Sequence, residues 1–141
     1  MAGYWLESGL TDATEIMLGS GATPTLSLGL YVNNHTPVWS DDTGAFTECS
    51  APGYSEVSIP YANWSINLSG SSPLVNTALP CTFSGTNRGS PGQVLYGYFL
   101  INTTSGLIWY AEFFGSTYTL PAAPWFYVVV PSFTMGQCGA C

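Results

Sequence analysis

Three stretches in the last third of the chain are apolar on both faces, and this restricts what the sequence can fold into. They span residues 94–101, 107–114 and 125–130, and each is rich in β-branched and aromatic residues, as strands are. A strand with one solvent-exposed face alternates between apolar and polar residues, whereas these three stretches barely alternate. We therefore expect a second cover over them, supplied in part by a helix and in part by another protein chain.

The rest of the chain after residue 21 predicts further short strands. Residues 25–32 alternate, with leucine or valine at every second position, and residues 53–59 have one polar side. Clusters of Gly, Pro, Asn and Ser separate the candidates, which favours an all-β fold, either an antiparallel β-sandwich or a jelly roll. The length of 141 residues, without a repeat or linker, indicates one domain over 1–141. The remaining candidate strands are residues 62–68, 78–84 and 125–134.

One short helix is predicted at the N-terminal end, over residues 5–18. Ser8 or Thr11 is the expected cap at its start, and Gly19 is the expected end. A helix this short is not stable alone in water, so we expect it to pack on the sheet or on a neighbouring chain. The apolar positions that share one helical face are Leu6, Leu10, Ala13 and Met17.

Charge excludes several classes of partner. Only 6% of the residues are charged, Arg88 is the only Lys or Arg, and the net charge is -7. Binding to nucleic acid or to anionic lipid through a basic patch is therefore not expected. No apolar run is long enough to span a membrane, and the first residues lack the features of a signal peptide. A surface rich in Ser, Thr, Asn and Gly on a protein made in the cytoplasm suggests a virion component.

Four cysteines leave more than one interpretation open. Cys138 and Cys141 have the C-x-x-C spacing of a zinc or redox pair, in a tail over 136–141. A zinc site would need Cys49 and Cys81 as widely separated ligands, and a redox pair normally begins a helix. We favour buried thiols, and any of the four cysteines could form disulfides within or between chains after the protein is released. We expect no metal and no cofactor.

Few residues can carry catalysis. His35 is the only histidine, and neither a G-x-S-x-G elbow nor a phosphate-binding loop is present. Asp41 and Asp42 precede Thr-Gly and are expected to cap a turn, with calcium binding as a minor alternative. We expect Glu112, within an aromatic strand, to be partly buried and paired with a backbone donor or another chain. The expected protein is therefore not an enzyme, and an envelope-degrading hydrolase is a disfavoured alternative.

Aromatic residues offer a different kind of binding. Stacking on sugar rings would make the protein a glycan-binding module, although aromatic residues on strands are more often part of a core. The candidates for such stacking are Trp39, Tyr61, Trp64 and Trp109.

The order of motifs carries a resemblance to a known group. After the N-terminal helix come Leu28-Gly29-Leu30-Tyr31, the acids Asp41, Asp42 and Glu48, then Gly53-Tyr54, Trp64, Gly97-Tyr98-Phe99 and Leu107-Ile108-Trp109. From about residue 5 to 134 this order resembles small bacteriophage virion proteins assigned to head decoration or to tail fibres. The tail over 136–141 departs from the pattern, and the group supplies no catalytic residues.

The resemblance implies a structural virion protein. A capsid decoration, or cement, protein would brace neighbouring capsid subunits, with the major capsid protein and copies of itself as partners. The alternative is a tail-fibre or receptor-binding module that recognises glycan. Small size, the lack of repeats and the two-sided apolar strands favour decoration. The residues that we expect at protein interfaces are Trp5, Leu6, Leu10, Tyr96, Tyr98, Trp109 and Trp125.

Overall fold

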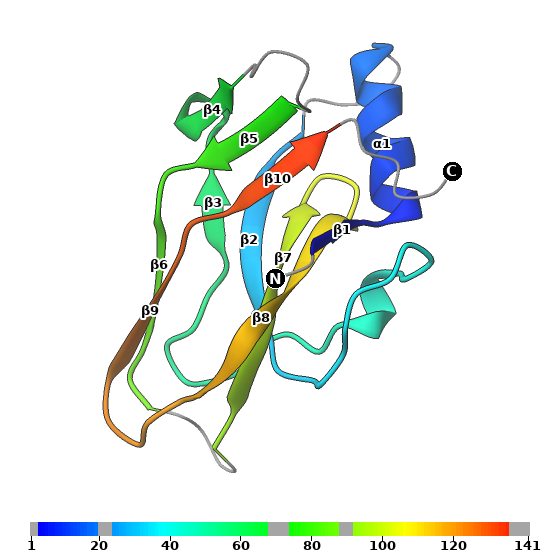
Figure 1. Ribbon diagram of the computed structural model, residues 1–141. Helices are drawn as coiled ribbons and strands as arrows, with labels where there is room; N and C mark the ends of the chain where they lie inside the picture. The colour runs from blue at the N-terminus through cyan, green and yellow to red at the C-terminus, as the bar shows by residue number, and fades with distance from the viewer. Residues whose placement is uncertain (1–2, 20–23, 68–73, 88–91, 136–141) are drawn as a thin grey trace.

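The computed structural model describes residues 3–19, 24–67, 74–87 and 92–135. It is mostly β, with 45% of the residues in strands and 14% in helix, and every strand pairing is antiparallel (Figure 1). The elements are β1 (Gly3–Trp5), α1 (Glu7–Met17), β2 (Leu26–Tyr31), η1 (Thr43–Ala45), β3 (Val57–Ile59), η2 (Tyr61–Asn63), β4 (Trp64–Asn67), β5 (Leu74–Ala78), β6 (Cys81–Gly85), β7 (Val94–Asn102), β8 (Leu107–Thr119), β9 (Trp125–Val129) and β10 (Ser132–Met135).

A five-stranded sheet forms the centre of the molecule, in the order β1-β8-β7-β2-β3. Its middle is the β7–β8 hairpin, whose turn includes Gly106 at a φ of 76°, a conformation that glycine adopts without steric cost. The strands expected over 25–32, 94–101 and 107–114 are confirmed, and β8 continues beyond the expected end to Thr119. The most apolar sequence therefore lies at the centre of the sheet.

The remaining strands form a three-stranded sheet in the order β10-β5-β4 and a two-stranded sheet of β6 and β9. β5 pairs with β10, and β6 pairs with β9, so residues 74–85 run beside residues 125–135 (Figure 1). The register changes by one residue where the pairing is interrupted, and Pro80 and Pro131 lie at this place. Proline has no N–H to donate to a ladder. The single strands expected over 78–84 and 125–134 are therefore each divided or shifted at a proline.

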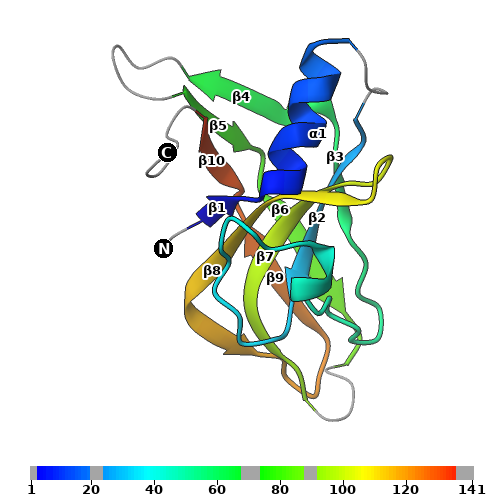
Figure 2. The same cartoon turned by 90° about the vertical axis from the view of Figure 1, so that its right-hand side faces the viewer.

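Both faces of the five-stranded sheet are covered by this chain itself. On one side, Leu28 and Leu100 pack in a cluster with Phe83 and Trp125 from β6 and β9. On the other side, α1 and the loop that contains η1 lie against the sheet (Figures 1 and 2). This corrects the expectation that β7 and β8 need a neighbouring subunit, because the second cover comes from the same chain. The buried residues of this second cluster are Leu6, Tyr31, Phe46, Phe99, Ile108 and Ala111.

The helix starts without the expected side-chain cap. Ser8 and Thr11 lie inside α1, and the N-cap residue is Leu6, which makes no side-chain cap hydrogen bond. The backbone N–H of Leu6 donates instead to the Trp109 carbonyl at 2.9 Å, and the N–H of Glu7 donates to the Trp39 carbonyl at 3.0 Å. Tertiary contacts thus replace the cap that the sequence predicts. The predicted end is confirmed, because Gly19 follows the helix with a φ of 78°.

Candidate functional site

A buried carboxylate lies on the inner face of β8. The Glu112 side chain is only 8% exposed, and its Oε2 accepts hydrogen bonds from the phenols of Tyr98 at 2.9 Å and Tyr110 at 3.1 Å. The expectation that Glu112 is partly buried is confirmed. The expected backbone donor is wrong, because inward-facing tyrosines on β7 and β8 supply the donors. Two neutral donors offset part of the cost of burying the charge.

The two phenols stay protonated and act as donors. Burial raises the pKa of Tyr98 and of Tyr110 well above that of an ordinary phenol, and the negative charge of Glu112 raises both further. A hydrogen bond with the backbone of Ser132 acts on Tyr98 in the opposite direction but does not reverse the shift. The cluster therefore places two protonated phenols, each an O–H donor, against the Glu112 side chain.

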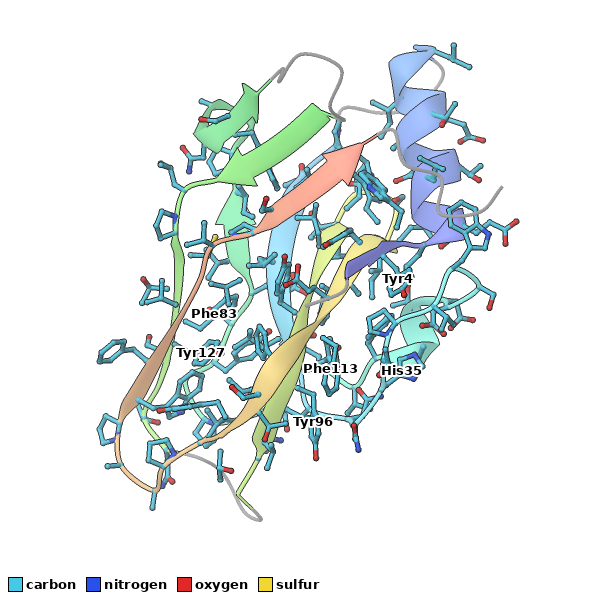
Figure 3. The ribbon with its side chains drawn as sticks, viewed as in Figure 1. Tyr4, His35, Phe83, Tyr96, Phe113 and Tyr127 are labelled. Carbon is cyan, nitrogen blue, oxygen red and sulfur yellow. The ribbon has the colours of Figure 1, made fainter. Side chains whose placement is uncertain are left out.

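A pocket of about 320 Å³ opens beside this carboxylate, between β8 and β9, and we call it the β8–β9 pocket. β1 pairs with β8 at Tyr110–Glu112, and β9 pairs with β6, so neither strand is paired with the other where the pocket lies. In Figure 3, Phe83 and Tyr127 point from β6 and β9 toward the five-stranded sheet. The lining residues are Tyr98, Glu112, Phe114, Gly115, Ser116, Tyr127, Val128, Val129 and Val130.

An apolar row lies exposed on the outer face of β9 and just beyond it. Phe126, Val128 and Val130 are 71%, 49% and 53% exposed, and we call these three residues the β9 row. They alternate with core residues of the same strand, as the two faces of a strand do. Ser84 and Thr82 lie opposite Phe126 and Val128 on β6. Of the three stretches that are apolar on both faces, 125–130 is the one that keeps an uncovered face.

The structure places most of the predicted interface residues in the core. Leu6, Tyr98, Trp109 and Trp125 are buried by residues of the chain itself, so their burial needs no partner. Trp5, Leu10 and Tyr96 are half-buried. Sequence reasoning missed the β9 row because it selected the largest aromatic residue of the stretch. Because every residue from Trp125 to Val130 is apolar, the sequence contains no alternation that separates outward from inward positions, and only the burial pattern in the structure does so.

The acids near His35 stabilise a loop. His35 Nε2 lies 2.7 Å from Asp41 Oδ2, which also accepts from the Val38 N–H at 2.7 Å. Asp42 Oδ1 accepts from the Gly44 N–H at 2.9 Å, so the expectation that Asp41 and Asp42 cap a turn is confirmed. His35 and this loop lie on the side of the five-stranded sheet away from β9 (Figure 3).

Two of the four cysteines are described, and both are free and buried thiols. Cys49 Sγ donates to Gln93 Oε1 at 3.3 Å, and Cys81 Sγ donates to the Leu79 carbonyl at 3.6 Å. Burial raises the pKa of both thiols. The tail with Cys138 and Cys141 lies outside the described residues, so the disulfides suggested there stay predictions.

The candidates for sugar stacking differ in their exposure. Trp109 is buried, and its Nε1 donates to Asp12 at 2.8 Å. Trp64 is half-buried, and the side chain of Tyr61 lies outside the described residues. Trp39, in the loop before η1, is 45% exposed. Among the three candidates whose side chains are described, Trp39 is therefore the one clearly presented to solvent.

No protein-family model, curated protein or solved structure matches this chain. Across the described ranges, no three His, Cys, Asp or Glu side chains are arranged so that they could hold a metal ion. The described part of the chain also contains no helix with the length and apolar character needed to cross a membrane.

Proposed function

We propose that this chain is a structural, non-enzymatic virion protein, a capsid decoration protein that binds the major capsid protein and copies of itself. The order of motifs that resembles phage virion proteins supports this proposal. The composition supports it too, since one histidine, one arginine and no lysine leave few groups for acid-base chemistry. The observation that carries the proposal is the β9 row.

The β9 row has the properties of a protein contact surface. A single exposed valine or phenylalanine is ordinary, whereas three at alternate positions along β9 and just beyond it form an apolar strip. β9 also lies at the edge of a two-stranded sheet within the described residues, and the chain has no lysine with which to protect such an edge. A partner that covers this strip would bury the exposed apolar side chains and protect the unpaired edge of β9.

We further propose that the sheets form a two-layer β-sandwich. The five-stranded sheet would be one layer, and the strands β4, β5, β6, β9 and β10 would be the other, with the cluster that contains Phe83 and Trp125 between them. Trp125, Tyr127 and Val129 anchor β9 from the inside. The row on the opposite face is thereby held in a fixed line, as a docking surface requires.

A receptor-binding module of a tail fibre is the second candidate, and Trp39 is the observation that favours it. Trp39 is exposed beside Val38, which is also exposed, in a loop. A sugar site normally combines aromatic rings with several hydrogen-bonding side chains. A single exposed ring supports glycan binding less strongly than the β9 row supports protein binding. Decoration therefore remains the preferred function.

The experiment compares a row variant with a matched control. Phe126→Ser combined with Val128→Ser removes the strip, and Thr82→Ala with Ser84→Ala changes the neighbouring positions on the same face. We expect the row variant to keep its unfolding temperature and lose at least about tenfold in binding to capsids that lack the protein. The control should bind as the wild type does, in co-sedimentation assays.

Copy number distinguishes the two candidates. Gel densitometry relative to the major capsid protein should give hundreds of copies per particle for a decoration protein and tens for a fibre module. Tight binding of receptor polysaccharide to the isolated protein, with no binding of the wild type to capsids that lack the protein, would contradict decoration. A wild-type chain that stays monomeric at high concentration and joins no particle would contradict both candidates.

A further inference from the structure

The buried Glu112 carboxylate forms part of the wall of the β8–β9 pocket. The hydrogen bonds from Tyr98 and Tyr110 both end on one of its oxygens, Oε2. A carboxylate more than nine-tenths buried thus borders an open pocket.

No cation of the described residues compensates this charge. The single Lys or Arg of the sequence, Arg88, lies outside them, and His35 pairs with Asp41 on the other side of the five-stranded sheet. Two phenols hydrogen-bond the carboxylate but leave it without an opposite charge. A buried anion gains most from a cation that reaches it in a water-poor setting. A cation that enters the pocket would therefore supply the opposite charge that Glu112 lacks among the described residues.

The walls of the pocket favour a planar cation. Phe114 and Tyr127 have ring centroids 5.3 Å apart, and Tyr98 and Phe114 have centroids 6.2 Å apart, and all three residues line the pocket together with Glu112. Cations are attracted to aromatic faces, and a guanidinium both stacks on rings and pairs with a carboxylate. A volume of about 320 Å³ is enough for such a side chain and small for a larger organic ligand.

The rim of the pocket connects it to the proposed contact surface. Val128 and Val130 belong to the β9 row and also line the pocket, so a protein that covers the row would lie over the opening. The chain's net charge of -7 favours a partner with a positive surface. We infer that the β8–β9 pocket receives an arginine side chain of the protein that docks on the β9 row. This inference rests on the proposed function for the existence of that partner.

The inference is tested first on the isolated, full chain with a small probe. The probe is N-acetyl-arginine methylamide, and its neutral counterpart is the citrulline derivative, which keeps the shape and loses the charge. Titration followed by NMR should give saturable shifts at Glu112, Tyr98 and Tyr127 for the arginine probe and none of comparable size for citrulline. Equal binding of both probes, or shifts only elsewhere, would overturn the inference.

Variants separate the pocket from general electrostatic attraction. Glu112→Gln keeps the acceptor and loses the charge, and we expect at least about tenfold weaker probe binding, as for loss of a charged hydrogen-bond partner. Glu7→Gln changes the net charge equally at an exposed position on α1 and should alter probe binding less than about twofold. Unchanged binding in Glu112→Gln would refute the inference.

A variant at the edge of the pocket, Ser116→Trp, provides an independent test in case Glu112→Gln destabilises the fold. Ser116→Trp places a large side chain at an exposed position of the pocket lining, and it should block the probe while the unfolding temperature stays close to that of the wild type. Binding of the probe to a well-folded Ser116→Trp variant at the wild-type affinity would contradict the location of the site.

Capsid binding distinguishes this inference from the function on which it rests. If the row variant loses capsid binding while Glu112→Gln and Ser116→Trp retain it, the arginine pocket is wrong and the decoration function stands. If wild-type chain takes up the arginine probe but joins no particle, the proposed function fails, and with it the assignment of the arginine to a docked protein. Parallel loss of capsid binding in all three variants supports both.

Discussion

Replacement of Asp12 by alanine should detach the helix from the central hairpin. Asp12 Oδ2 accepts three hydrogen bonds of 2.8 Å, from Asn102 Nδ2, Ser105 Oγ and Trp109 Nε1. Asn102 and Trp109 are buried, so the loss of their acceptor leaves two buried donors without a partner. At about 1–2 kcal/mol for each, the free energy of unfolding should fall by about 3 kcal/mol, with little from the exposed serine. For a chain of this size, this lowers Tm by about 10 °C.

Thermal unfolding and urea titration would measure the effect. Glu7→Ala is the control, an exposed acid in the first turn of α1 whose loss should cost less than about 1 kcal/mol. Trp109→Phe removes the indole donor but keeps an aromatic ring, so the double-mutant cycle with Asp12→Ala should show a coupling of about 1–2 kcal/mol. A change below about 0.5 kcal/mol for Asp12→Ala, or zero coupling, would show that these hydrogen bonds do not hold the helix.

Further outcomes follow from burial and protonation. Phe99→Ala should lower the free energy of unfolding by about 3–5 kcal/mol because Phe99 is buried on the helix side of the sheet. Asp42→Ala, at an exposed turn, should lower it by less than about 1 kcal/mol. Equal urea midpoints for the two variants would contradict the placement of Phe99 in the core. The pKa of Asp12 lies below its ordinary value of 3.8, since burial raises it but hydrogen bonds from Asn102, Trp109 and Ser105 outweigh burial. As the pH falls, the carboxylate of Asp12 is therefore protonated in the unfolded chain before it is protonated in the folded chain. The difference in the free energy of unfolding between wild type and Asp12→Asn should be constant above about pH 4 and shrink below it. Thermal unfolding at several pH values would measure this difference. Burial and raised pKa values should make Cys49 and Cys81 react slowly with iodoacetamide in the folded protein and rapidly in urea; mass spectrometry that finds rapid labelling of the folded protein would refute this.

The periodicity of apolar residues was enough to identify most strands. The remaining strand boundaries depend on strand pairing and on proline, which periodicity does not reveal. The alternation over 25–32 and the apolar stretches over 94–101 and 107–114 predicted β2, β7 and β8, because the side-chain period of a strand is visible in any one sequence. β1 spans three residues, which is too short for a period, and it forms because β8 offers an edge. The divided strands near Pro80 show that a missing N–H overrides an apolar pattern.

The candidate site was less accessible to sequence reasoning because it depends on segments far apart in the chain. The burial of Glu112 was predictable from its aromatic neighbours, and the donor Tyr110 lies two residues away on β8, but the donor Tyr98 comes from the register of β7 on β8. The pocket exists because β9 approaches β8 without pairing, which no local pattern encodes. The second cover over the central strands required the loop around Phe46, which has no regular period.

The pairing of β1 and α1 with β8 affects how the chain can fold during its synthesis. Gly3 lies opposite Glu112, and α1 packs on the same strand, so the first two elements find their partner only after most of the chain has left the ribosome. β2 likewise cannot pair until β7, which comes much later in the sequence, has been synthesised. Until then, Leu6 and the leucines of β2 remain accessible to chaperones or to other nascent chains. Rapid translation through the β7–β8 hairpin should therefore shorten the interval in which misassembly competes with folding.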